Sequence, residues 1–409
     1  MPSASTSSEN APHFLDQPKA VWATAFAAMV GFMSIGLVDP ILVSISKGLD
    51  ATPAQVSLLF TSYFAVTSVM MLVTGFVASR LGGRGTLLLG AALIVIFAGL
   101  AGTSNSIPEL VAYRAGWGLG NAFFVVTALS VIVASSRGGT MAAILMYESA
   151  LGLGISAGPL LGAVLGNISW RLPFFGTATL MAIGFVAIFF LLKPTPLPAQ
   201  KISIGDPLKA LKHRGLATVA SSAFFYNYAF FTVLAFVPFV LQMSAYTVGG
   251  IFFGWGVLLA IFSVAIAPRL QSRFSGLVLL SAMLFFLALL LVAIALGSRE
   301  AVIAAVVLSG AVMGINNTVY TEMALEISPA PRAVASAGYN FVRWFAGVIA
   351  PFAAPKIAEL AGSTTTFLIA AAAAMLAIGV AVAGRNHLGR FARPHREDVA
   401  STITASSTP

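Results

Sequence analysis

Five ionisable residues lie inside long apolar stretches of this 409-residue sequence: Asp39, Arg114, Glu148, Glu322 and Arg343. An ionisable side chain inside a bilayer costs roughly 2.5–3.5 kcal/mol on insertion scales and commonly marks a proton or substrate pathway. A buried carboxylate can take up and release a proton, and a buried guanidinium can balance it or bind an anionic group. We therefore expect these residues to move protons or bind a substrate within a membrane.

Other kinds of chemistry have no support in the sequence. Cysteine is absent, and none of the four histidines falls in an apolar stretch, so we expect neither a disulfide nor a thiolate metal site. The G-x-x-x-x-G-K-[ST] pattern of a nucleotide-binding loop and the H-E-x-x-H pattern of a zinc protease are both missing. We expect no catalytic residues, no metal, no cofactor and no enzyme activity.

The elements that position these residues are predicted to be membrane-spanning helices. Hydrophobic residues make up 58% of the chain and charged residues 9%, whereas soluble domains carry about 25% charge. This excludes soluble, disordered and nucleic-acid-binding proteins. A helix crosses the hydrocarbon core of about 30 Å with roughly 20 apolar residues. Hydropathy predicts twelve such spans, at residues 19–45, 54–78, 86–102, 108–134, 140–165, 172–192, 216–242, 248–267, 277–296, 301–325, 333–360 and 366–383.

The basic residues predict how the chain is oriented. With the N-terminus inside, sixteen of the 22 Lys and Arg residues fall in inner segments and four in outer loops, which follows the positive-inside rule. We expect a multi-pass protein of the cell (inner) membrane with both termini cytoplasmic. The polar stretch 193–215 is expected to be a cytoplasmic linker between six-helix bundles at 19–192 and 216–384, with tails at 1–18 and 385–409.

Short matches relate the two halves of the sequence. Ala78–Arg84 and Ala267–Arg273 share the pattern A-x-R-L-x-x-R, Tyr147 and Pro159 correspond to Tyr339 and Pro351, and Gly116 and Gly120 correspond to Gly310 and Gly314. The offsets are 189, 192 and 194 residues. This near-constant spacing predicts a duplicated six-helix unit. Parallel repeats of this kind are a transporter architecture in which the substrate site lies between the halves.

Three motifs with regularly spaced glycines stand in the first half. Residues 75–84 include Gly75, Arg80, Gly82 and Arg84; Arg114 is followed by Gly118 and Gly120; and the fifth span carries Gly154, Gly158, Pro159 and Gly162. With these motifs the chain resembles the major facilitator superfamily. They are similar to its loop between helices 2 and 3 (G-x-x-x-D-R-x-G-R-[KR]), its helix-4 pattern (R-x-x-x-G-x-G) and its helix-5 antiporter pattern (G-x-x-x-G-P-x-x-G-G, here with Ala163 in the last place).

The resemblance is to the 12-helix drug:proton antiporters, and it implies an all-α fold of two pseudo-symmetric six-helix bundles. One departure stands out, because Ser79 replaces the Asp of the family loop and Gly83 replaces a basic residue. In the family that Asp helps to lock the two halves in the outward-open state. Arg80 and Arg84 remain and can bind carbonyls at helix C-termini. The resemblance therefore implies a latch that is weaker or built differently.

Asp39 and Arg114 are both predicted to lie in the outer third of the membrane, about 28 Å along helix 1 and about 9 Å inward from the outer end of helix 4. In the family, helices 1 and 4 line the same side of the cavity. We hypothesise that the two residues form a charge pair that a proton or a cationic substrate disrupts, since Arg114 favours ionised Asp39 and burial opposes it. Pro40 can bend helix 1 at this point. The alternative is a static pair that fixes helix packing.

Glu148 and Arg343 are predicted near the membrane midplane, about 12 Å into helix 5 and about 15 Å into helix 11. Glu148 is a second candidate proton carrier, or a counter-ion for a cationic substrate; the alternative is a structural hydrogen bond to a Tyr or to backbone. Arg343 balances Glu148 or binds an anionic substrate group; the alternative is a local bond to Tyr339 or Asn340.

Polar side chains on helices 7, 10 and 11 are the candidates for substrate binding, because the resemblance places helices 7 and 10 at the cavity and such pockets combine apolar walls with a few orienting polar groups. They are Tyr226, Tyr228, Asn316, Asn317 and Arg343. Glu322, one turn before Glu326 near the inner end of helix 10, is expected simply to reach water among the headgroups.

We expect a secondary transporter whose bundles rock about a midplane site. It would work as a monomer in the bilayer and export small amphipathic or lipophilic compounds in exchange for protons, without a nucleic-acid partner. The direction and the ion are implied by the resemblance of the helix-5 motif. The alternatives are a proton-coupled importer or facilitator of a small metabolite, and a non-transporting membrane sensor or assembly subunit.

Neutralising Asp39 tests the first charge pair. Asp39→Asn is expected to abolish proton-coupled efflux, because an amide cannot exchange a proton with the aqueous phases. The measurement is substrate accumulation in inverted membrane vesicles under an imposed pH gradient. Unchanged proton-coupled efflux would contradict a role for Asp39 in coupling.

Overall fold

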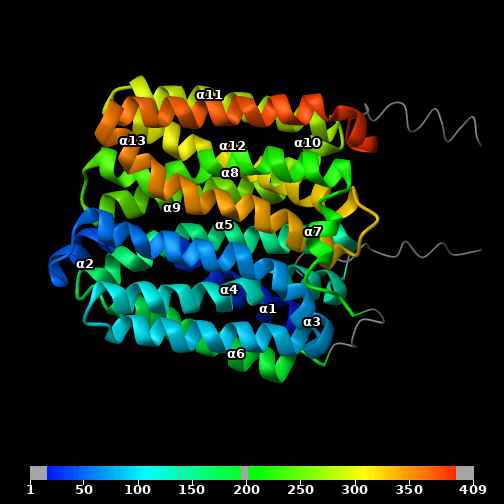
Figure 1. The fold of residues 1–409 in the computed structure, drawn as a ribbon, viewed down its shortest axis with the longest axis horizontal. Coiled ribbons are helices and arrows are strands. Elements are labelled where there is room, and N and C mark those ends of the chain that lie inside the picture. Colours follow the sequence, from blue (N-terminus) through cyan, green and yellow to red (C-terminus); the bar gives the residue numbers. More distant parts are fainter. Residues whose placement is uncertain (1–15, 138, 195–200, 393–409) are drawn as a thin grey trace, which may run out of the picture.

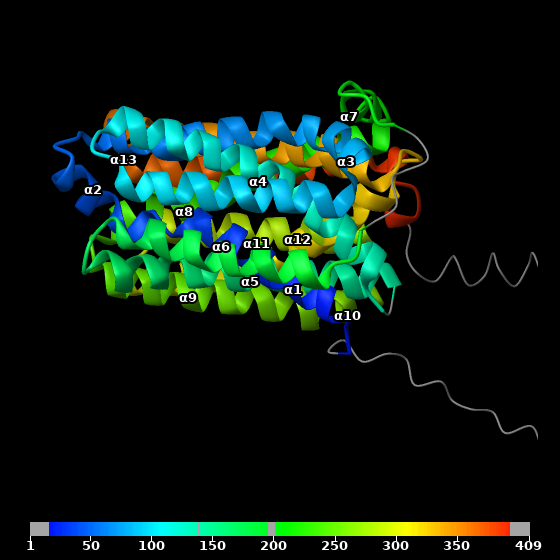
Figure 2. The same cartoon turned by 90° about the horizontal axis from the view of Figure 1, so that it is seen from below.

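The computed structural model describes residues 16–137, 139–194 and 201–392, and these residues form helices and no strands. Most of the two predicted tails, at 1–15 and 393–409, and the middle of the predicted linker, at 195–200, lie outside the described residues. The long helices run roughly parallel to one another along a single direction (Figures 1 and 2).

The helices follow the order that hydropathy predicts. They are α1 (Lys19–Gly36), α2 (Leu42–Gly48), α3 (Pro53–Thr103), α4 (Ile107–Ser135), α5 (Gly139–Gly166), α6 (Leu172–Leu191), α7 (Asp206–Ala210), α8 (Arg214–Leu241), α9 (Ala245–Ile261), α10 (Ala267–Gln271), α11 (Gly276–Leu296), α12 (Arg299–Glu326) and α13 (Arg332–Ala383). Short helical turns complete the described chain: η1 (Asp39–Ile41), the π-helical η2 (Phe262–Ile266), η3 (Arg385–His387) and η4 (Gly389–Ala392).

Within the described residues, ten helices are long and apolar enough to cross a membrane, and two of them, α3 and α13, each consist of two helices joined at a glycine. α3 turns at Gly82, which has a φ of 72°, and α13 turns at Gly362, which has a φ of 84°. Glycine is the residue that adopts this left-handed backbone without a steric penalty. The twelve predicted spans are thereby confirmed, although two pairs are joined by a one-glycine turn rather than by a loop.

Two spans differ from the prediction in their course. The first was expected to run unbroken over 19–45, but α1 ends at Gly36 and the chain continues through η1 and α2. Pro40 explains the break, because it has no N–H to donate to Gly36 and its ring clashes with that carbonyl. The eighth runs on through η2 and α10 to Gln271, beyond the predicted end at 267.

Helices α1–α6 form one bundle and α8–α13 the other, and the two bundles lie side by side (Figure 1). α5 packs along α9, and α3 packs along α13, so these two pairs of helices make most of the interface, and α5 also contacts α12. On α3, the ring of Phe64 lies 4.7 Å from that of Phe231 and 5.8 Å from that of Trp344. Between α5 and α9 the approach is closer, since a methyl group on Gly256 would overlap Ser156.

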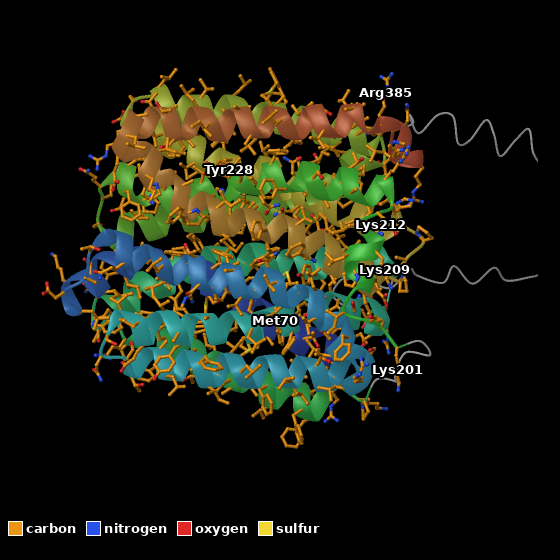
Figure 3. All side chains as sticks on the ribbon, viewed as in Figure 1. Met70, Lys201, Lys209, Lys212, Tyr228 and Arg385 are labelled. Atoms are coloured by element: carbon orange, nitrogen blue, oxygen red, sulfur yellow. The ribbon has the colours of Figure 1, made fainter. Side chains whose placement is uncertain are left out.

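One end of the double bundle carries the linker helix α7, and we call it the linker end. The described parts of both termini also reach this end (Figure 1). Figure 3 shows Lys201, Lys209, Lys212 and Arg385 there as well. The opposite end carries α2 and the connection between α8 and α9. Basic side chains are therefore concentrated where the two bundles are joined.

The glycine ridge of α5 packs directly on the backbone of α1. A methyl group on Gly154, Gly158 or Gly162 would overlap the carbonyl oxygens of Met29, Met33 and Leu37, respectively. The glycines are four residues apart and meet carbonyls at nearly the same spacing, which is the small-xxx-small packing that brings helix backbones together in membranes. Because the neighbouring atoms are backbone, they have little room to move aside.

Gly158→Ala is expected to lower the stability of the protein. The added methyl group overpacks the α1–α5 contact, which typically costs about 1–3 kcal/mol. The measurement is the thermal unfolding midpoint of purified protein in detergent.

Gly250→Ala on α9 is the matched control, because a methyl group there has nothing within 4 Å, and we expect it to leave the midpoint unchanged or raise it. Equal midpoints for the two variants would contradict tight packing at the ridge.

Candidate functional site

A buried carboxylate joins the two bundles near the middle of the molecule. Glu148 on α5 has no exposed surface, and its Oε1 accepts a hydrogen bond of 2.9 Å from the hydroxyl of Thr321 on α12. Its second oxygen, Oε2, has no hydrogen-bond partner among the described residues. A buried carboxylate needs such hydrogen bonds because burial removes the water molecules that would otherwise solvate it. One half of the Glu148 carboxylate therefore retains the capacity to accept a further donor.

Arg343 on α13 supplies the opposite charge at this place. Its side chain is buried, and Nη1 donates to the hydroxyl of Tyr339 at 3.1 Å. It interacts electrostatically with Glu148, but the two do not approach within the 4.0 Å of an ion pair among the described contacts. The local bond to Tyr339, one of the predicted alternatives, is present. The roles of Arg343 in balancing Glu148 or in binding an anionic substrate group stay predictions.

Tyrosines and amides of α8 and α12 adjoin this pair. The Tyr226 hydroxyl lies 3.1 Å from the carbonyl oxygen of Met313 and from Oδ1 of Asn317. Its ring stacks on that of Tyr320, with centroids 5.4 Å apart. Both polar atoms of the Asn316 amide, and Nδ2 of Asn317, are buried without a hydrogen-bond partner among the described residues. Two of the predicted substrate-binding residues, Tyr226 and Asn317, thus lie in contact on facing helices.

A small cavity lies next to Thr321, Tyr339 and Arg343. Its volume is about 10 Å³, and it lies between the bundles. Its walls come from α4, α5, α12 and α13, namely Leu129, Tyr147, Thr321, Ala324, Leu325, Ser336, Tyr339, Asn340 and Arg343. This volume suits about one water molecule. The site is therefore closed in this structure, and a larger molecule enters only if α5 separates from α12 and α13.

The sequence repeat points to residues that charge and hydropathy missed. Tyr147 and Tyr339 are equivalent in the two halves, and both line the cavity. The same offset of 192 residues relates Glu148 to Asn340, another lining residue. Thr321 carries no such signal, since buried threonines are common in apolar helices, and only its position opposite Glu148 distinguishes it.

Tyr228 does not join the cluster. It lies two residues from Tyr226, which at 100° per residue places it roughly 200° around α8. Its side chain is only partly buried (Figure 3). The structure therefore gives this predicted substrate-binding residue a different face of the helix from Tyr226.

Arg114 lies in a separate aromatic site within the first bundle. Its guanidinium is fully buried, 4.4 Å from the centre of the Tyr63 ring and 4.8 Å from that of Trp117. The Tyr63 hydroxyl lies 3.1 Å from the hydroxyl of Ser34 on α1. The backbone of Asp39 is in η1, but its side chain lies outside the described residues, so the predicted pair with Arg114 stays a prediction.

The loop motif at the linker end makes its hydrogen bonds within the first bundle. Ser79 donates to the carbonyl of Phe76 at 2.9 Å, within its own helix. Arg80 donates to the same carbonyl at 3.0 Å, and Arg84 donates to the carbonyl of Phe189 near the C-terminus of α6 at 2.6 Å. Arg84 thus bonds a helix-end carbonyl, as the sequence suggested.

The glycines of the helix-4 motif also pack within the first bundle. A methyl group on Gly118 or Gly120 of α4 would be within 2.9 Å of backbone atoms of α3, so both glycines serve the close approach of these two helices. Gly75 instead faces the linker, where a methyl group would lie 3.3 Å from Ile202.

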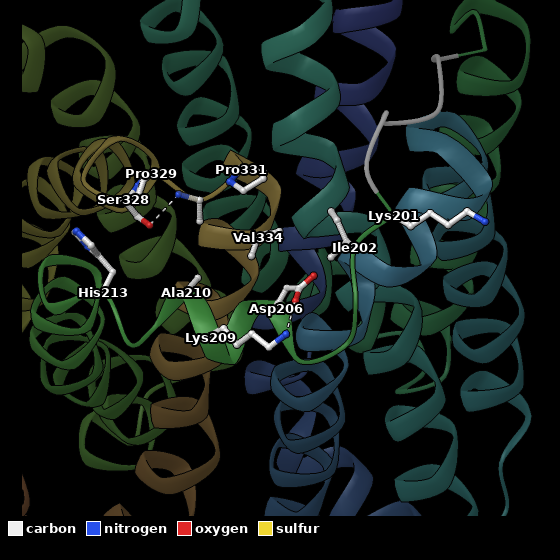
Figure 4. A pocket seen from close by; sticks show the side chains of 11 residues that line it. Lys201, Ile202, Asp206, Lys209, Ala210, His213, Ser328, Pro329, Pro331 and Val334 are labelled. Carbon is white, nitrogen blue, oxygen red and sulfur yellow. Dashed lines mark hydrogen bonds and ion pairs between the residues drawn. The ribbon is translucent and has the colours of Figure 1, made fainter.

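A second and larger cavity, of about 790 Å³, lies at the linker end beside α7 (Figure 4). Asp206 in its wall is bonded by neighbouring groups of the linker. The backbone N–H of Ser203 donates to Asp206 at 2.7 Å and the Lys209 ammonium lies 3.2 Å away, and these bonds hold the pKa of the Asp206 carboxyl below its usual range. The cavity lies at the surface, far from the buried charges between the bundles.

Glu322 differs from its expectation. Rather than simply extending to water, its carboxylate accepts a hydrogen bond from the Gln271 amide at the end of α10. Glu326, one turn on, pairs with Arg390 of η4. Both acids therefore tie the linker end of α12 to neighbouring segments of the second bundle.

The chain is similar to known proteins in sequence and in fold. A sequence model described as the Major Facilitator Superfamily matches residues 24–351. The chain belongs to this superfamily. It is 46% identical over 385 residues to the multidrug efflux protein YfmO of Bacillus subtilis (strain 168), covering 93% of this chain and 97% of that protein. A tetracenomycin C resistance and export protein of Streptomyces glaucescens is 29% identical over 172 residues, covering 39% of this chain and 32% of that protein.

A solved structure shares the same arrangement of helices. The crystal structure of the human organic anion transporter MFSD10 (TETRAN) superimposes with a TM-score of 0.75, covering 88% of this chain and 98% of that one, at 17% identity. At this identity the likeness concerns the fold. The predicted superfamily fold of two six-helix bundles is thereby confirmed, and the chain is a membrane-spanning member of a transporter superfamily related to multidrug exporters.

Removing the hydroxyl of Thr321 tests the bond between the bundles. Thr321→Val leaves Glu148 buried without its donor, which we expect to cost about 1–3 kcal/mol. The measurement is the thermal unfolding midpoint in detergent.

Thr321→Ser keeps the hydroxyl and is the matched control, for which we expect a midpoint closer to that of the wild type. Equal losses in the two variants would mean that the methyl group, and not the hydrogen bond, is what matters.

Proposed function

We propose that this protein is a proton-coupled secondary transporter that exports small amphipathic or lipophilic compounds by alternating access. The observation that carries the proposal is the hydrogen bond between Glu148 and Thr321. It joins the two bundles at the closed cavity, and it must break when the bundles separate there. A carboxylate that loses its partner in an apolar interior needs a replacement. A proton or a hydrogen-bond donor on the substrate can each be that replacement, and only one of them at a time.

Such competition is what exchange requires. When the site faces a proton-rich compartment, Glu148 takes up a proton and the substrate leaves. When it faces the other compartment, the proton leaves and the substrate binds. Moving one charge through 100 mV is worth about 2.3 kcal/mol, so a single proton per cycle drives useful accumulation.

The other features fit the same cycle. YfmO is a multidrug efflux protein and the Streptomyces glaucescens relative is a resistance and export protein, which supports outward transport by this chain. The basic linker end would face the cytoplasm of the cell membrane, following the positive-inside rule. Arg114 and Asp39 would form a second proton-sensitive pair in the first bundle, and one chain contains both bundles, so a monomer is sufficient.

The local bonding of Ser79 bears on how the bundles are held together. In this structure its hydroxyl bonds Phe76 of its own helix rather than the second bundle. We infer that the loop motif holds the closed linker end only weakly, and that the contacts of α5 and α3 with the second bundle supply the rest.

Neutralising Glu148 separates coupling from transport. Glu148→Gln keeps a hydrogen-bonding side chain but cannot release a proton, so we expect it to abolish efflux driven by a pH gradient and to retain exchange of substrate for substrate. Both are measured in proteoliposomes, with uptake of an amphipathic dye and with counterflow.

Glu300→Gln is the control, since Glu300 is an exposed acid at the opposite end of the bundle, and it should behave as wild type. Retention of pH-driven efflux by Glu148→Gln would overturn the role of this residue. Absence of counterflow in the wild type would overturn transport itself.

A further inference from the structure

Two charges of opposite sign lie beside one small buried cavity in this protein. Arg343 of α13 lines the cavity, and Glu148 of α5 bonds Thr321 in its wall. Both charged residues are buried. The other titratable groups that interact with Glu148 are the phenols of Tyr147, Tyr226 and Tyr339, from α5, α8 and α13. Phenols are neutral at physiological pH. With Glu148 ionised, the net charge of the site is therefore zero.

The same groups have unused hydrogen-bonding capacity of both kinds. Oε2 of Glu148 is an acceptor without a partner, and Nε of Arg343 is a donor without a partner, among the described residues. Buried polar atoms rarely stay unpaired in a stable protein. A ligand that brings both a donor and an acceptor would satisfy atoms that the closed protein leaves unsatisfied.

The sign of the charges limits what else can bind. A permanent cation attracted to Glu148 would be placed beside Arg343, and in a medium of low dielectric constant that repulsion is strong. An anion attracted to Arg343 would meet the same difficulty with ionised Glu148. An uncharged molecule meets neither repulsion and gives up less hydration on entering.

We propose that Arg343 sets the charge selectivity of the site, so that it accepts uncharged compounds carrying one hydrogen-bond donor for Glu148 and one acceptor for Arg343, and discriminates against permanent cations. Amides and phenols are the chemical class that fits. This inference rests on the proposed function for its setting, because it concerns the substrate of the same cavity. It differs from the counter-ion role for Glu148, which would favour cations.

Binding to purified protein in detergent tests this selectivity without any gradient. The probes are a hydroxybenzanilide, which is uncharged, and two derivatives in which a trimethylammonio group or a carboxylate replaces the hydroxyl. Affinities are measured by titration calorimetry for the full chain. We expect the wild type to bind the uncharged probe at least tenfold more tightly than either charged one.

Two variants should shift the preference in opposite directions. Arg343→Gln leaves Glu148 unbalanced, so the affinity for the cationic probe should rise at least tenfold. Glu148→Gln leaves Arg343 unbalanced, so the carboxylate probe should gain at least tenfold. Arg343→Lys keeps the charge and should keep the wild-type order. Arg273→Gln is the control, since it removes one positive charge from an exposed position and should change no ratio.

Clear outcomes overturn the proposal. If the wild type binds the cation as tightly as the uncharged probe, the site is not selective for neutral ligands. If Arg343→Gln fails to fold, the probe affinities of Glu148→Gln and Arg343→Lys still test the proposal. If Glu148→Gln and a folded Arg343→Gln both keep the wild-type ratios of affinity between the probes, the charge pair does not set the selectivity. Binding in detergent needs no proton gradient. A failure of proton exchange in liposomes would therefore not contradict the selectivity for uncharged probes, and a lack of that selectivity would not contradict proton exchange.

Discussion

A carboxylate placed between two apolar helix bundles has to be satisfied by the protein, because no bulk water reaches it. Glu148 meets this requirement with a donor from the opposite bundle, Thr321, and with the charge of Arg343 nearby. Each of these partners belongs to the second bundle, while Glu148 belongs to the first. The electrostatic stability of the closed site is therefore tied to the position of one bundle relative to the other, and any separation of the bundles changes the environment of the acid.

The rest of the fold makes that separation possible as a motion of two bodies. Within the first bundle, the glycines of α5 bring its backbone against α1, and Gly118 and Gly120 do the same between α4 and α3. In the second, methyl groups on Gly310 and Gly314 would overlap the backbone of α9. Contacts of this kind resist sliding because backbone atoms cannot rotate away. Between the bundles, the contact at Phe64 and Trp344 is built from side chains, which can exchange one packing arrangement for another, whereas α5 and α9 approach closely at Gly152 and Gly256.

Much of the fold could be predicted from the sequence, because a bilayer accepts few alternatives. A stretch of about 20 apolar residues has to be a helix if its backbone groups are to be satisfied, and this gave the twelve spans in order. The exceptions are local. Pro40 ended α1 earlier than hydropathy indicates, and Gly82 and Gly362 joined neighbouring spans by a single left-handed residue, which hydropathy does not register. The close packing of the glycine ridge of α5 could also be predicted, because glycines four residues apart lie on one face of a helix and let another helix backbone come close.

The sequence by itself determined that Glu148 and Arg343 are buried charges, because both lie deep within apolar helices. It did not determine what they contact. Depth along a helix fixes a residue's height in the membrane, but the rotation of the helix and the identity of its neighbours depend on how twelve helices pack together. Only the tertiary structure brought Thr321 to Glu148 and grouped Tyr226 with Asn317. These contacts join residues far apart in the chain, and no local pattern encodes them.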